Sequence, residues 1–117
     1  MANPNIVAVA TINGKTAVAN VSTTATAIVT NSAASNKVFK VNALIVSNID
    51  GTNNADVSVD LFRSSYPYYI IRTCSVPADA SIDLISKSIY LEEGDSLRVA
   101  ASANNDLQVV CSYEEIS

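Results

Sequence analysis

Few residues in this sequence have side chains suited to catalysis, and histidine is absent altogether. Without histidine the chain lacks the commonest general base and the commonest metal ligand. Serines are frequent, but no Gly-x-Ser-x-Gly turn surrounds one and no base stands ready to activate one. We therefore expect no catalytic residue, no cofactor and no enzymatic activity, with a secreted enzyme as the remotest alternative.

The densest group of carboxylates is Glu92, Glu93 and Asp95, which surround Gly94. General acid-base catalysis would require two of these side chains to converge on a substrate. Adjacent residues of a turn point apart, and the motif contains no histidine or lysine. We interpret it as a solvated β-turn, and Glu114 and Glu115 as a polar end of the chain.

A second group of oxygen-bearing side chains comprises Asp50, Asn53, Asn54 and Asp56. Such side chains can bind calcium, but the spacing lacks the bidentate acid of an EF-hand, and no helical pattern flanks it. We expect a plain loop between strands and no metal site, with calcium as the minor alternative.

The aromatic residues cluster around Pro67, as Tyr66, Tyr68 and Tyr69. Successive side chains of a strand face opposite ways, so at most one of the latter two shares a surface with Tyr66. Tyrosine is favoured at protein interfaces, and the tryptophan that strengthens sugar platforms is missing. These tyrosines are candidate contacts with a partner protein or, as the alternative, with a glycan.

The cysteines, Cys74 and Cys111, both lie in strand-like runs. We expect buried free thiols that behave as small hydrophobic residues, and a disulfide between them is the alternative.

Charge is unevenly distributed, although the net value is only −4. Residues 1–49 carry three lysines and no acid (+3), and residues 50–117 carry four cations against eleven acids (−7). This skew would let the amino-terminal part of one copy lie against the carboxy-terminal part of another, although chance explains it equally well. The acidic balance and the absence of a basic cluster argue against nucleic-acid binding. No apolar run approaches the ~20 residues of a membrane helix, so we expect no membrane contact.

Short runs of β-branched and alternating residues recur along the chain between turn-forming residues, without a helical period. At this length the chain is one domain with one core. The pattern predicts an all-β antiparallel β-sandwich, jelly-roll or immunoglobulin-like, and a barrel is the alternative. The expected strands are residues 6–11, 16–21, 26–30, 38–47, 55–63, 68–76, 81–84, 88–91, 96–101 and 107–113.

Residues 1–37 differ in composition from residues 38–117, and we assign residues 38–117 to the sandwich core. The dipeptide Asn13-Gly14 separates two β-prone runs, which predicts a hairpin with a type I′ turn. The flanking side chains are small and bury little area, so this segment needs support from elsewhere. It is either an edge hairpin on the main sheet or an extended arm that packs on a neighbouring subunit.

Two further predictions concern pairing and burial. The alternating runs 96–101 and 107–113 flank Asn104-Asn105-Asp106, so we expect them to form an antiparallel hairpin. The run 38–47 is apolar on both faces, with Phe39, Val41, Ala43 and Ile45 on one of them. It therefore belongs in the middle of the sandwich or beneath another subunit.

One stretch of the sequence resembles a known class of protein. The aliphatic strand 88–91 enters a Leu-x-x-Gly-Asp-x-Leu turn formed by Leu91, Gly94, Asp95 and Leu97, and a small-residue strand and a final strand with Ser-Tyr-Glu follow. This arrangement, over residues 38–117, resembles small β-sandwich structural proteins of tailed bacteriophages. The resemblance concerns architecture and implies no site residues.

The resemblance implies a non-enzymatic virion protein that assembles as a homo-oligomer, with capsid decoration favoured slightly over a neck, head-to-tail or tail position. Its partners would be copies of itself and other virion proteins, namely major capsid, portal or tail proteins, and assembly would take place in the host cytoplasm. The alternative is a glycan- or receptor-binding module of a fibre that uses the three tyrosines.

Overall fold

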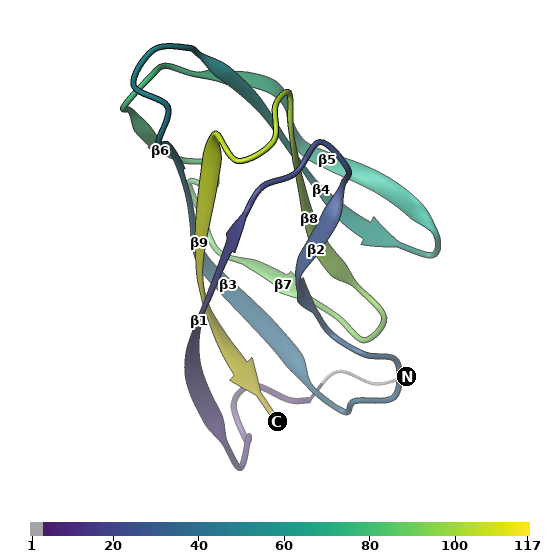
Figure 1. Ribbon diagram of the computed structural model, residues 1–117. Coiled ribbons are helices and arrows are strands. Elements are labelled where there is room, and N and C mark those ends of the chain that lie inside the picture. Colours follow the sequence, from purple (N-terminus) through teal and green to yellow (C-terminus); the bar gives the residue numbers. More distant parts are fainter. Residues whose placement is uncertain (1–3) are drawn as a thin grey trace.

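The computed structural model describes residues 4–117 and contains no helix in that range. Nine strands form two antiparallel sheets that face each other (Figure 1), which confirms the predicted β-sandwich. Sheet A has the order β1-β9-β3-β6, with β7 also paired to β3, and sheet B has the order β2-β8-β4-β5. No helix able to span a membrane occurs among the described residues. The strands are β1 (Ile12–Asn20), β2 (Thr26–Thr30), β3 (Val38–Asn48), β4 (Ala55–Arg63), β5 (Tyr66–Val76), β6 (Ser81–Asp83), β7 (Ile89–Leu91), β8 (Ser96–Ala101) and β9 (Leu107–Ile116).

The core lies between the sheets and is built from the inward residues of alternating strands. In β8 the residues Leu97, Val99 and Ala101 are buried, as their alternation predicts. Leu107 and Val109 of β9 face them from the other sheet. Branched aliphatic side chains dominate this interior, because they suit the pleated, half-buried surface of a strand.

The predicted hairpin between residues 96–101 and 107–113 is wrong. Strand β8 pairs with β2 and β4, and β9 pairs with β1 and β3, so the connection 102–106 crosses from sheet B to sheet A. Both arrangements bury the same alternating side chains, because the two sheets of a sandwich present their inner faces to each other. Alternation alone does not choose between them.

Strand β3 also differs from its predicted pattern. Its pairing with β9 shifts between Val41 and Ala43, where Asn42 forms a β-bulge. A bulge inserts one extra residue and therefore exchanges the inward and outward faces of the strand beyond it. Phe39 and Val41 point inward before the bulge, but Ala43 and Ile45 lie outside after it.

The predicted turn at Asn13-Gly14 is wrong as well. Strand β1 runs through both residues and keeps unbroken register with β9, with Gly14 opposite Glu114. A continuous nine-residue ladder on β9 offers more pairing than a hairpin of small residues. β1 and β2 join different sheets, and the connection between them places Val21 in the core. Residues 6–11 are not in a strand.

A two-residue turn does occur at Ser64-Ser65, between β4 and β5. Arg63 pairs with Tyr66, and both serines have positive φ, 53° and 62°. Two positive φ values are the requirement of a type I′ turn, which favours asparagine and glycine. Serine adopts this conformation at a cost, because its Cβ approaches the carbonyl oxygen.

The double variant Ser64→Asn/Ser65→Gly is therefore expected to raise the free energy of unfolding by about 1 kcal/mol. Urea unfolding followed by circular dichroism measures the change. The matched control is Ser32→Asn, at an exposed loop position with no positive φ, which we expect to change the free energy by less than about 0.5 kcal/mol. A double variant no more stable than the parent would contradict this account of the turn.

Candidate interaction surfaces

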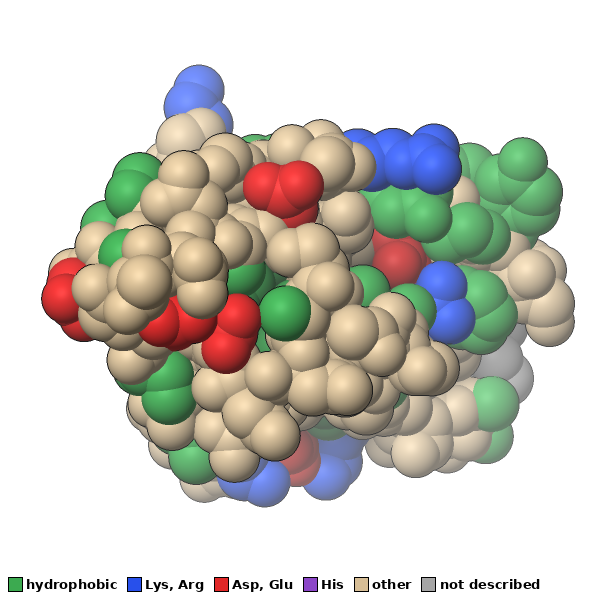
Figure 2. Space-filling model, turned by 45° about the horizontal axis from the view of Figure 1, so that its top comes forward, with side chains coloured by type: hydrophobic (Ala, Val, Ile, Leu, Met, Phe, Trp, Pro, Cys, Tyr) green, Lys and Arg blue, Asp and Glu red, His purple; other side chains and the backbone are tan. Residues whose placement is uncertain are grey.

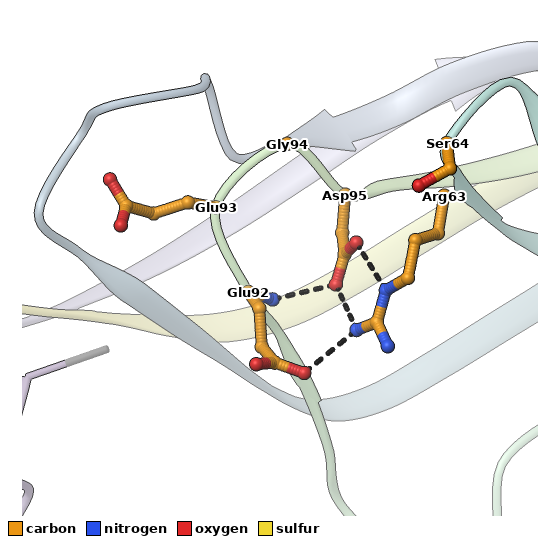
Figure 3. A pocket seen from close by; sticks show the side chains of 6 residues that line it. All are labelled: Arg63, Ser64, Glu92, Glu93, Gly94 and Asp95. Atoms are coloured by element: carbon orange, nitrogen blue, oxygen red, sulfur yellow. Dashed lines mark hydrogen bonds and ion pairs between the residues drawn. The ribbon is translucent and has the colours of Figure 1, made fainter. Parts of the chain in front are cut away.

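The carboxylates around Gly94 take part in a fixed network (Figure 3). Asp95 is 1% exposed, and its two oxygens accept bonds from Arg63 Nε (2.7 Å) and Nη2 (2.5 Å) and from the Glu92 amide (2.8 Å). Arg63 Nη2 also lies 2.9 Å from Glu92 Oε2. The hydrogen bonds that Arg63 donates to Asp95 raise the pKa of Arg63. This network ties the end of β4 to the turn between β7 and β8.

This network fixes the turn between β7 and β8. The Glu93 carboxylate points away from the Arg63–Asp95 pair in Figure 3, and Glu93 Oε2 accepts a bond from the Asn36 amide. Its other oxygen, Glu93 Oε1, is buried and has no hydrogen-bond partner among the described residues. The residues around Gly94 therefore hold the sandwich together at one end.

The loop that could have bound calcium is organised by its own amides. Asp50 Oδ1 accepts a bond from the Thr52 amide (2.9 Å), and Asp50 Oδ2 accepts one from Asn53 Nδ2 (3.3 Å). The bond from the Thr52 amide is the main cause of the lowered pKa of Asp50. Asn54 Oδ1 accepts a bond from the Ala78 amide in the neighbouring loop. No group of three or more acidic, cysteine or histidine residues suited to a metal occurs in residues 4–117.

Both cysteines are free. Cys111 is buried in sheet A, as expected, and Cys74 is only partly buried on β5 at the edge of sheet B. Burial raises the pKa of the Cys111 thiol to about 11. The thiol is therefore protonated and unreactive at neutral pH.

This shift predicts a loss of stability in alkali. The folded chain binds the Cys111 proton more tightly than the unfolded chain, so the contribution is complete below pH 9 and is lost as the pH rises to about 11. We expect the free energy of unfolding to fall by about 2 kcal/mol from this residue over that interval. The readout is the difference in pH slope between the parent and Cys111→Val, because the other titrating groups are common to both. Parallel slopes would contradict the assignment.

The three candidate tyrosines lie on β5 at the tip of the β4–β5 hairpin, which projects away from the other strands in Figure 1. All three are exposed. Tyr66 and Tyr68 pack against each other with ring centroids 5.4 Å apart. Tyr69 instead lies under the guanidinium of Arg72, whose Cζ is 4.8 Å from the centroid of the Tyr69 ring. The structure thus unites Tyr66 with one neighbour, as alternation requires. Their contact with a partner stays a prediction.

An apolar stripe crosses the outer face of sheet A. Val18 of β1, Val110 of β9 and Ile45 of β3 are paired neighbours in register and are 72%, 41% and 39% exposed. The residues beside them on β1, β9 and β3 are uncharged, and Asp83 of β6, opposite Ile45, borders the stripe. A shallow hollow lies between β1 and β9. The uncharged neighbours are Thr16, Asn20, Ala43, Ser47, Gln108 and Ser112. We call these nine residues the outer plate.

The outer plate could not be predicted from the sequence. The signal is present as single apolar residues in three distant strands, and only the register of β1, β9 and β3 aligns them. The sequence places Ile45 in the sandwich or beneath another subunit. The bulge at Asn42 puts it on the surface, so the first alternative is wrong for this residue and the second stays a prediction.

Charge also differs between the ends of the molecule. Several acidic side chains are visible on the face shown in Figure 2, which brings the top of Figure 1 forward. Asp79 lies close to Gly51 of the neighbouring loop. At the opposite end Lys15 and Lys37 both bind Glu115, at 2.9 Å and 2.5 Å. The hydrogen bonds from these lysines lower the pKa of Glu115. The charge skew of the sequence is thus partly compensated within one chain.

Comparisons with known proteins show the fold. No family model matches the chain, and no curated protein matches it. A solved structure of Bacillus endospore appendages, described as disulfide-linked pili, aligns with a TM-score of 0.56 and 13% identity over 92% of this chain and 87% of that one. The two share a fold. At 13% sequence identity, the likeness shows the fold alone.

Two further structures are of a pentameric capsid protein from metagenomic phage sequences. They align with TM-scores of 0.45 and 0.43 and identities of 19% and 18% over 84% of this chain. This chain spans about three fifths of their length, 60% and 59%.

Proposed function

We propose that the chain is a non-enzymatic structural protein of a tailed-phage particle and acts in many copies. The observation that carries the proposal is the outer plate, where Val18, Val110 and Ile45 expose apolar area without a charged residue between them. An exposed apolar patch on a flat face is typical of a protein-protein interface. The hydrogen-bond networks around the carboxylates stabilise the fold.

Assembly of copies agrees with the rest of the molecule. The spore-appendage protein that shares this fold forms disulfide-linked pili, and within one copy of this chain both thiols are free. Each copy would bury modest area, and the number of copies would supply the strength. We favour capsid decoration slightly over a neck or tail position. The further partners would be major capsid, portal or tail proteins.

The proposal also retains the division of the chain. Residues 38–117 would form the body of the subunit, and the extended residues 1–37 would support it and reach toward neighbours. β1 and β2 are edge strands of the two opposite sheets of the same chain.

Immunogold microscopy of density-purified particles from cells that carry the gene tests the proposal. We expect label in fixed positions on the particles for the parent chain. Val110→Lys, which places a charge in the outer plate, should fold normally and reduce incorporation by at least tenfold, because an interface must leave that charge unpaired. Ser32→Lys, at an exposed loop position outside the outer plate, should incorporate like the parent. Unlabelled particles, or full incorporation of Val110→Lys, would contradict the proposal.

A specific observation favours one alternative. Tyr66 and Tyr68 form an exposed aromatic pair at the tip of a projecting hairpin, a surface on which a sugar ring could stack. A glycan array with the parent and Tyr66→Ala decides this: specific binding lost in the variant would favour a receptor-binding module.

A further inference from the structure

The four edges of the two sheets differ in how far they are protected against pairing with another strand. β5 pairs with β4 through two register shifts, and β2 is five residues long with a shift of its own. β6 and β7 contain three residues each. Bulges and shortness are the usual means by which an edge is blocked.

The edge formed by β1 has no such protection. Its nine residues pair with β9 without a shift, from Ile12 opposite Ile116 to Asn20 opposite Gln108, and almost all of them are exposed. In an antiparallel ladder, alternate residues direct N–H and C=O away from the partner strand. The single charged side chain, Lys15, is bound to Glu115 of its own sheet, 2.9 Å away. This edge is open along its length.

A segment suited to such an edge lies immediately before β1. Residues 6–11, Ile-Val-Ala-Val-Ala-Thr, are uncharged and β-prone, yet they belong to no strand. Val7 is 90% exposed, and Ile6 lies in an open hollow beside Val38 and Tyr90. Only at its end does the segment join a sheet partner, where the Ala10 and Thr11 amides donate to the Ser117 carbonyl.

This segment cannot easily reach the β1 of its own chain. Pairing within one chain would require a reversal close to Asn13-Gly14, and the structure extends both residues along β9. The same segment of a second copy faces no such constraint. Six extended residues span about 20 Å and nine span about 30 Å, so the segment fits the edge.

We propose that residues 6–11 of one copy add as a further strand to β1 of a second copy. This inference rests on the proposed assembly of copies and supplies its mechanism. The added strand would exchange the shallow contact of Ile6, and the bonds that the Val7 and Ala8 amides donate to Asn5, for backbone hydrogen bonds to a second copy. It would place aliphatic side chains beside Val18 at the border of the outer plate. Repetition of the contact in one direction produces a ring or a filament, and reciprocal exchange between two copies closes a dimer.

Proline substitution tests the mechanism because proline cannot donate a backbone hydrogen bond. Val7→Pro/Ala8→Pro removes the amide N–H of two successive residues, which point to opposite edges of an extended segment. Val7→Thr/Ala8→Thr keeps the β-propensity of the segment and serves as the control. Sedimentation velocity should show assembled species for the parent and the threonine variant, and at least a tenfold weaker association for the proline variant. Near-ultraviolet circular dichroism should show all three folded, since residues 7 and 8 lie outside the sheets.

A second measurement separates this mechanism from the proposed function. A peptide of residues 5–11 added to the labelled proline variant should shift the amide resonances of β1 and leave those of β5 unchanged, and its proline version should not. If the parent and proline variants assemble equally, or the peptide leaves β1 unperturbed, strand addition is wrong while assembly stands. If the parent stays monomeric and is absent from particles, the proposed function fails, and the peptide result still decides whether β1 accepts a strand.

Discussion

Replacing Arg63 with methionine will lower the free energy of unfolding by about 3 kcal/mol. The variant leaves Asp95, which is 1% exposed, without the cation that donates two of its hydrogen bonds. An unpaired buried carboxylate carries its desolvation penalty uncompensated. Urea unfolding, followed by circular dichroism, measures the change.

Two variants make this test specific. Glu92→Gln removes only the exposed partner of Arg63, and we expect a loss below about 1 kcal/mol. Arg63→Met/Asp95→Asn removes both charges and should recover a large part of the stability. If Arg63→Met costs no more than Glu92→Gln, then the Arg63–Asp95 pair behaves as an ordinary surface ion pair and the account of this turn is wrong.

Replacing Asn31 with alanine will lower the free energy of unfolding by about 3 kcal/mol. Asn31 is fully buried after β2, and its side-chain amide donates to the carbonyls of Lys37 (2.8 Å) and Leu91 (3.0 Å). Alanine leaves both carbonyls without that donor and creates a small cavity. The loss therefore exceeds that of one surface hydrogen bond.

The near-isosteric variant Asn31→Asp should be at least as unstable at neutral pH. A carboxylate cannot donate, and it would face the two carbonyl oxygens that the amide now bonds. Asn13→Ala, at an exposed position of β1, should change the free energy by less than about 0.5 kcal/mol. Thermal and urea unfolding of the set measures these differences. Equal stability of Asn31→Ala and Asn13→Ala would contradict the role of the buried amide.

Local pattern predicted the strands well. The bounds expected for β2, β4 and β8 agree with the structure, because alternation with period two is written in the chain itself. Pairing was harder to predict. β8 and β9 bury the same side chains whether they form a hairpin or face each other across the core, so the choice depends on the rest of the fold.

Turn-forming residues were misleading at Asn13-Gly14, whereas the turn expected over residues 64–67 does occur, in a shorter form. Asn13-Gly14 is the strongest local turn signal, yet the ladder with β9 extends it. The type I′ turn forms at Ser64-Ser65, where the neighbouring strands determine the register. Tertiary pairing overrode local preference in both cases.

The two candidate surfaces also differ in whether the sequence alone reveals them. The tyrosines of β5 could be found in the sequence because they are neighbours in it, and alternation predicted that Tyr66 would share a surface with only one of the other two. The outer plate could not be found in this way, because Val18, Ile45 and Val110 meet only through the register of three strands.

The central claim is that this chain serves by binding to copies of itself through its exposed sheet surfaces. Sedimentation velocity of the purified chain over a hundredfold range of concentration tests it most directly. We expect a concentration-dependent shift from monomer to a defined multimer, which Val110→Lys suppresses. A single monomeric species at every concentration, identical for parent and variant, would contradict the claim.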